Sequence, residues 1–157
     1  MKIGIVVYSQ TGNTLLVAAK LKEKLAAAGH SVVLDQVKLA GECKQGPREC
    51  QLGPLPDVTP YDVLVFGAAV EAFSLSPVMA KCLAQIGSLQ KKSVVCLITQ
   101  GLPFAWLGGS RAARQMRKLC EAKGAAVRGA AVVNWMGKGL DRRIAEGVDR
   151  LSKLVLG

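Results

Sequence analysis

Residues that perform acid–base or hydrolytic chemistry are scarce in this sequence. It has one histidine, His30, in 157 residues, and only 4% of its residues are aromatic. No Ser/His/Asp set and no pair of carboxylates stands out, so catalysis by side chains alone is not expected. The low aromatic content, with no Lys/Arg-rich block and no zinc-finger spacing, also argues against nucleic-acid binding.

Acidic residues are few as well. Eleven Asp and Glu stand against 21 Lys and Arg, which gives a formal net charge of +10. Such a charge attracts anionic partners at long range. With nucleic acid disfavoured, an acidic protein or a phosphorylated small molecule is the more natural partner.

Long apolar runs are missing too, so no membrane span is expected, and no signal-peptide pattern opens the sequence. The length and the 50% apolar content predict one domain, residues 1–157. Cys43 and Cys50 are too few for an iron–sulfur cluster or a closed zinc site, so no metal is expected. Because Cys82, Cys96 and Cys120 lie in apolar segments, the cysteine usage is typical of a reducing compartment and predicts a cytoplasmic protein.

Short apolar runs that suit buried strands alternate with helical patterns. A long loop is expected over 38–60 and a second over 68–75, while Ser76, Ser110 and Asp141 mark helix starts. The alternation predicts an α/β, doubly wound, five-stranded parallel sheet with helices on both faces. Two strand orders compete for such a sheet, the Rossmann order and 2-1-3-4-5, and a single-phosphate loop after the first strand, described next, favours 2-1-3-4-5. The strands are expected at 3–8, 31–37, 61–67, 93–99 and 125–134.

The first strand leads directly into a polar loop and then a helix. The loop consists of Ser9, Gln10, Thr11, Gly12, Asn13 and Thr14. A strand-to-helix turn presents backbone N–H groups and a positive helix end, which suits a phosphate. The loop lacks the Lys of a triphosphate loop and the three glycines of a dinucleotide fingerprint. It therefore predicts a cradle for a single terminal phosphate.

This loop resembles the phosphate loop of the flavodoxin family, whose members bind flavin mononucleotide (FMN). The resemblance implies an FMN site at the carboxyl ends of the strands, where the strand order reverses. It also implies that the loops after the third and fourth strands hold the flavin ring. Their expected cofactor-binding residues are Ala68, Ala69, Val70, Glu71 and Phe73, then Thr99, Gln100, Gly101, Leu102, Phe104 and Gly108.

The leading hypothesis is an FMN-binding electron-transfer protein that exchanges electrons with a redox protein. The alternatives are a flavin-dependent NAD(P)H:quinone oxidoreductase and a flavodoxin-fold interaction domain without bound flavin. The basic charge and the sparse aromatic cover, with Phe73, Phe104 and Trp106 as candidates, depart from electron-carrying flavodoxins. A basic stripe of Arg111, Arg114, Arg117 and Lys118 is either a solvated surface, a dock for an acidic redox protein, or a guide for a phosphorylated nicotinamide donor.

Overall fold

The computed structural model describes residues 1–41, 50–101 and 108–157. Its sheet contains five long parallel strands in the order β2-β1-β3-β5-β6, and the short β4 pairs antiparallel with the end of β3. Without β4, this is the predicted order 2-1-3-4-5, and the α/β doubly wound class is confirmed. The strands are β1 (Lys2–Val7), β2 (Ser31–Gln36), β3 (Val63–Glu71), β4 (Ser74–Leu75), β5 (Ser93–Gln100) and β6 (Ala126–Asn134).

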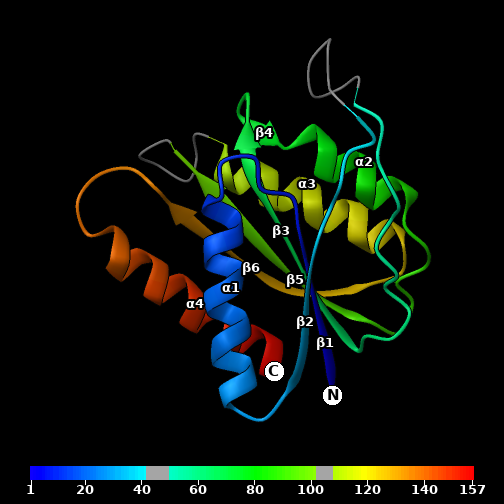
Figure 1. Ribbon diagram of the computed structural model, residues 1–157, viewed down its shortest axis with the longest axis horizontal. Coiled ribbons are helices and arrows are strands. Elements are labelled where there is room, and N and C mark those ends of the chain that lie inside the picture. Colours follow the sequence, from blue (N-terminus) through cyan, green and yellow to red (C-terminus); the bar gives the residue numbers. More distant parts are fainter. Residues whose placement is uncertain (42–49, 102–107) are drawn as a thin grey trace.

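Two helices cover each face of the sheet (Figure 1). Helices α1 (Asn13–Ala27) and α4 (Leu140–Leu156) cover one face, and α2 (Pro77–Gln85) and α3 (Gly109–Ala122) cover the other. Side chains of β3 alternate between two cores: Val63 and Val65 pack beneath α1 and α4, whereas Leu64 and Phe66 pack beneath α2 and α3. A central strand buried on both faces explains the continuous apolar run in the sequence.

The expected loop over 68–75 is wrong. Strand β3 continues to Glu71, turns through Ala72 and Phe73, and returns as β4. Both turn residues have positive φ, 50° and 63°. A two-residue hairpin with positive φ usually carries Asn or Gly, so the Ala-Phe pair gave no sign of it.

Of the three residues predicted to mark helix starts, one is confirmed at its predicted place and the other two lie just inside their helices. Ser76 precedes α2 and Pro77 is its first residue, as predicted. Ser110, however, lies inside α3, which begins at Gly109 after Gly108. Close packing favours glycine at this first position, since a Cβ on Gly109 would lie 2.6 Å from Gln100 Oε1. Helix α4 begins one residue before Asp141, at Leu140.

The two edges of the sheet differ. On β6 the register shifts opposite Val94 and Val95, and Arg150 Nε donates to the carbonyl of Ala130 at 2.8 Å. On β2 the side chains alternate between exposed and half-buried up to Leu34, and Val33 is 46% exposed. In the three described stretches of chain, no helix combines the length and apolar character needed to cross a membrane.

Candidate functional site

A cavity of about 260 Å³ lies at the carboxyl ends of the parallel strands, where the order reverses between β1 and β3. In doubly wound sheets this is the usual place for a ligand. Three segments distant in sequence meet there, following β1, at the end of β3 and at the end of β5. The lining residues are Tyr8, Gln10, Thr11, Asn13, Thr14, Ala69, Val70, Glu71, Thr99, Gln100 and Gly101.

Ser9 shapes the loop after β1 rather than lining the cavity. Its Oγ accepts hydrogen bonds from the backbone N–H of Gly12 (3.1 Å) and of Leu15 (3.2 Å). Leu15 N–H is one of the donors that the first turn of α1 leaves without an intrahelical acceptor. Gly12 has φ +90°, a conformation that glycine adopts most readily. These two residues fold the loop so that its remaining donors can face a ligand.

The remaining donors of the loop suit an anion. Within the described chain, the N–H groups of Gln10, Thr11, Asn13 and Thr14 have no hydrogen-bond partner. The first turn of α1 contains no acidic residue that would oppose a negative ligand. The helix dipole adds a partial positive charge at the same place. This chemistry fits a phosphate group.

The Thr14 hydroxyl joins this loop to the end of β5. Thr14 Oγ1 lies 2.7 Å from Thr99 Oγ1, and both residues are buried, at 1% and 2% exposed. One hydroxyl donates to the other, so the accepting one keeps its own proton for a further acceptor. Gly67 makes room for this approach, because a Cβ there would lie 3.1 Å from Thr14 Cγ2 and 2.8 Å from Val7 Cγ1.

Tyr8 lines the cavity, although the sequence assigned it only to the strand. Burial, and secondarily the negative charge of Glu71, raise the pKa of the Tyr8 phenol. The phenol therefore stays protonated and can donate a hydrogen bond at neutral pH. Its position directly before the polar loop was the one signal that could have identified it.

Gly108 and Gly109 allow the start of α3 to pack closely against the segments that line the cavity. A Cβ on Gly108 would lie 2.7 Å from Val70 Cγ1 and 3.1 Å from Phe73 Cα. The hairpin that carries Glu71 is thus held against α3. A second tie comes from Gln115, whose Oε1 accepts the N–H of Leu75 at 2.8 Å.

Some predicted cofactor residues do not line the cavity. Ala68 is fully buried in the core, and Phe73 is 58% exposed on the hairpin turn. Ser9, Gly12 and Gly108 shape the surrounding backbone. The predictions for Leu102, Phe104 and Trp106, and those for Cys43, fall outside the described residues.

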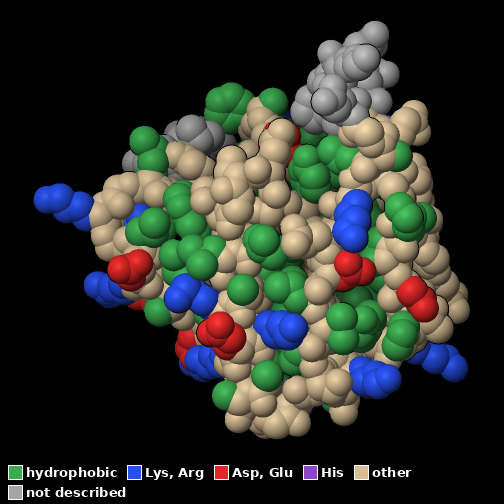
Figure 2. Space-filling view, viewed as in Figure 1, with side chains coloured by type: hydrophobic (Ala, Val, Ile, Leu, Met, Phe, Trp, Pro, Cys, Tyr) green, Lys and Arg blue, Asp and Glu red, His purple; other side chains and the backbone are tan. Residues whose placement is uncertain are grey.

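The residues of the basic stripe on α3 do not all lie near the cavity. Arg111 is exposed in the first turn, whereas Arg114 and Arg117 border a separate space of about 120 Å³ over β6. Arg117 Nε also pairs with Glu121 Oε1 at 2.8 Å. Figure 2 shows the opposite face, that of α1 and α4, where Lys and Arg are spread out with acidic side chains between them. Only Arg111, in the first turn of α3, remains a candidate for acting near the cavity.

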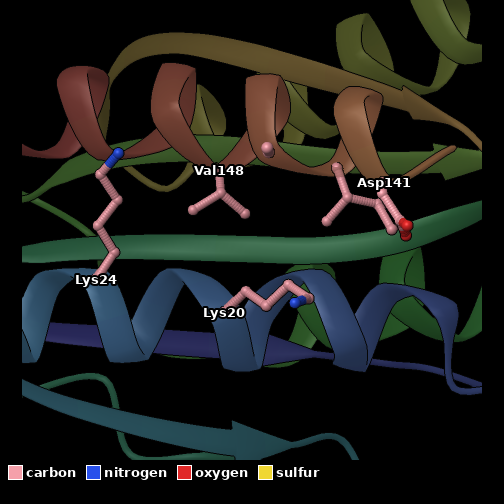
Figure 3. A pocket seen from close by; sticks show the side chains of 6 residues that line it. Lys20, Lys24, Asp141 and Val148 are labelled. Atoms are coloured by element: carbon pink, nitrogen blue, oxygen red, sulfur yellow. The ribbon is translucent and has the colours of Figure 1, made fainter. Parts of the chain in front are cut away.

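A larger cavity, about 310 Å³, lies between α1 and α4 and shares no lining residue with the first. Figure 3 shows Lys20 and Lys24 of α1 facing Asp141 and Val148 of α4 across this space. Lys24 Nζ is already paired with Asp149 at 3.0 Å. This cavity lacks the donor-rich loop and is a groove between two packed helices.

The free cysteines offer no reactive site. Cys82, Cys96 and Cys120 are fully buried, and desolvation raises their thiol pKa values, to about 11 for Cys82 and about 12 for Cys96. A protonated, buried thiol is a poor nucleophile. Cys50 is buried and disulfide-bonded. Across the described residues, no group of three or more His, Cys, Asp or Glu could hold a metal ion.

No family model and no curated protein sequence matches this chain. Solved structures do match it over nearly its whole length. A short-chain flavodoxin associated with a non-canonical PDU bacterial microcompartment superposes with a TM-score of 0.67 at 14% identity, covering 99% of this chain and 97% of that one. Oxidised Flavodoxin 2 from Bacillus cereus gives 0.67 at 18% identity, with 98% and 99% covered.

A third match is a flavoprotein from Lactobacillus acidophilus NCFM that was solved in complex with FMN. Its TM-score is 0.64 at 18% identity, and the match covers 96% of this chain and 98% of that one. These matches establish that the chain has the flavodoxin-like fold, in agreement with the resemblance of its first loop.

Proposed function

We propose that this protein binds FMN and transfers electrons. The observation that carries the proposal is the cavity that joins a neutral, donor-rich loop after β1 to the ends of β3 and β5. The likeness in fold to a flavoprotein solved with FMN supports it. Bound FMN would supply the electron-accepting ring, and the chain would bind and orient it.

The residues of the loop have distinct roles in this proposal. The N–H groups of Thr11, Asn13 and Thr14, with the Thr11 hydroxyl, would bind the phosphate. The Thr14–Thr99 hydrogen bond would fix the spacing between the phosphate loop and the wall beside the ring. The small side chain of Ala69 lets a flat ligand approach the backbone at the end of β3.

The test is an absorption spectrum of the purified protein with and without FMN, followed by fluorescence-quenching titrations with FMN and riboflavin. Riboflavin lacks the phosphate, and each hydrogen bond to a charged group contributes about 1.5–3 kcal/mol. We therefore expect riboflavin to bind at least about tenfold more weakly. Equal affinities would contradict the role of residues 9–14, and no binding of either flavin would favour an interaction domain.

A flavin-dependent NAD(P)H:quinone reductase is the second candidate. One observation favours it: Phe73 is 58% exposed and does not line the cavity, so among the described residues no aromatic side chain from the β3–β4 turn covers the site where a nicotinamide would approach the ring. Stopped-flow mixing of the FMN-loaded protein with NADPH separates the two functions. An electron carrier should keep its flavin oxidised, whereas rapid bleaching and turnover with a quinone would identify the reductase.

A further inference from the structure

The connection between β6 and α4, residues 135–139, adjoins the cavity but belongs to none of the three segments that line it. The N–H of Trp135 donates to the carbonyl of Gln100 at 2.8 Å, and Gln100 lines the cavity. Figure 1 shows this connection extending outward beyond the arrowhead of β6. It therefore occupies the carboxyl edge of the sheet beside the candidate site.

Arg143 holds this connection in one conformation. Its Nε donates to the carbonyl of Asn134 at 2.8 Å, and its terminal nitrogens donate to the carbonyls of Met136 (2.6 Å), Gly137 (3.3 Å) and Lys138. The N–H of Met136 also donates to Asn134 Oδ1 at 3.0 Å. A planar guanidinium with several carbonyl acceptors orders a loop before any partner arrives, which lowers the entropy cost of binding.

The ordered connection presents an apolar side chain next to cations. Met136 is 55% exposed, and neither Lys138 nor Arg111 forms an ion pair within the described chain. Arg111 is included because the first turn of α3, which carries it, begins against β6, the strand that leads into this connection. A Cβ on Gly109 would lie 2.7 Å from Val132 Cγ1, at the end of β6. Met136, Lys138 and Arg111 are named here the Met136 surface.

We propose that the Met136 surface docks an acidic redox protein. An exposed apolar side chain on the same connection as the unpaired Lys138, with the unpaired Arg111 in the first turn of α3, has the composition of a transient interface. In such an interface charge steers the encounter and the apolar group is buried on contact. The net charge of +10 favours an acidic partner over a basic one. This proposal rests on the proposed electron-transfer function for the identity of the partner, but the surface can be tested without flavin.

The experiment uses an acidic plant-type [2Fe–2S] ferredoxin as the probe, titrated into the flavin-free and the FMN-loaded protein. Dissociation constants are measured by calorimetry at low and high salt, and the contact surface is mapped by chemical shifts of the ¹⁵N-labelled chain. The variants are Lys138→Glu, Arg111→Glu and Met136→Ser. Lys91→Glu is the matched control, because Lys91 lies before the amino end of β5, whereas residues 135–139 follow the carboxyl end of β6.

We expect Lys138→Glu and Arg111→Glu each to weaken ferredoxin binding about fivefold at low salt, and less at high salt. Met136→Ser should weaken binding equally at both salt concentrations, and Lys91→Glu should change it by less than about twofold. Chemical shifts should change around residues 135–139 with or without FMN.

Equal losses in all three charge variants, or shift changes confined to another face, would overturn the proposal. So would a concentration-dependent dimer that Met136→Ser abolishes, since the surface would then bind a second copy of this chain. A DNA duplex that outcompetes the ferredoxin at this surface would overturn it in favour of nucleic acid. If FMN fails to bind while ferredoxin still docks here, the docking surface stands and the proposed flavin function fails.

Discussion

At the scale of single residues, two polar side chains of the candidate site already form hydrogen bonds within the protein. The Ser9 hydroxyl is used by the backbone of its own loop, and the Thr14 hydroxyl by Thr99. Thr11, in contrast, is exposed. Substitutions at Thr14 and Thr11 should therefore affect stability and FMN binding differently.

Thr14→Val keeps the shape of the side chain and removes its hydroxyl. We expect it to lower the free energy of unfolding by about 1–3 kcal/mol, because it leaves the Thr99 hydroxyl buried without this partner. It should also weaken FMN binding. Urea unfolding and flavin fluorescence measure the two effects. Thr14→Ser is the control that restores the hydroxyl, and Thr11→Ala should weaken FMN binding with unchanged stability.

The polar content of the loop could be predicted from the sequence, but its pairings could not. Six neighbouring residues with a helix after them were enough to indicate a phosphate site. The Thr14–Thr99 hydrogen bond joins residues 85 positions apart, and only the sheet brings them together. Arg143 lies in α4 and donates to carbonyls of the preceding connection, and such contacts leave no pattern in a sequence because every residue has a carbonyl.

At the scale of elements, the β3–β4 hairpin is the part of the fold that the sequence did not predict. The five long strands followed from apolar runs and alternation, and their order from the single-phosphate loop that follows the first strand. The hairpin did not, because Ala72 and Phe73 occupy positive φ without the usual turn residues. Such residues cost of order 1–3 kcal/mol each, which the surrounding structure must offset. The packing of Gly108 against the turn is one such support.

Gly108→Ala tests this support. The new Cβ would lie 2.7 Å from Val70 Cγ1 at a φ of 131°, so both contact and backbone strain oppose it. We expect a loss of about 1–3 kcal/mol in the free energy of unfolding, measured in urea, with weaker FMN binding. Gly87→Ala is the control, since nothing lies within 4 Å of a Cβ there and its φ is not positive. Similar losses in both variants would contradict a supporting role for Gly108.

At the scale of the whole molecule, the net charge of +10 should set the reduction potential of bound FMN. Fully reduced FMN becomes anionic, and surrounding positive charge stabilises that form. We expect the second reduction step to lie at a less negative potential than in an acidic flavodoxin, with the difference shrinking as salt rises. Arg111→Glu should lower this potential by on the order of tens of millivolts, and Lys91→Glu by less. An anaerobic redox titration at two ionic strengths measures both, and a potential insensitive to salt and to Arg111→Glu would refute this prediction.

The unequal edges of the sheet also bear on how copies of this chain behave when concentrated. An exposed strand edge can recruit a strand from another molecule and begin aggregation. On β6 the irregular register and the guanidinium of Arg150 on the Ala130 carbonyl interrupt the row of groups that a new strand would need. On β2 the consecutive Val32, Val33 and Leu34 are followed by Asp35, the only charged side chain of that strand. Self-association by strand addition would therefore begin at β2, and Asp35 is the residue that most opposes it.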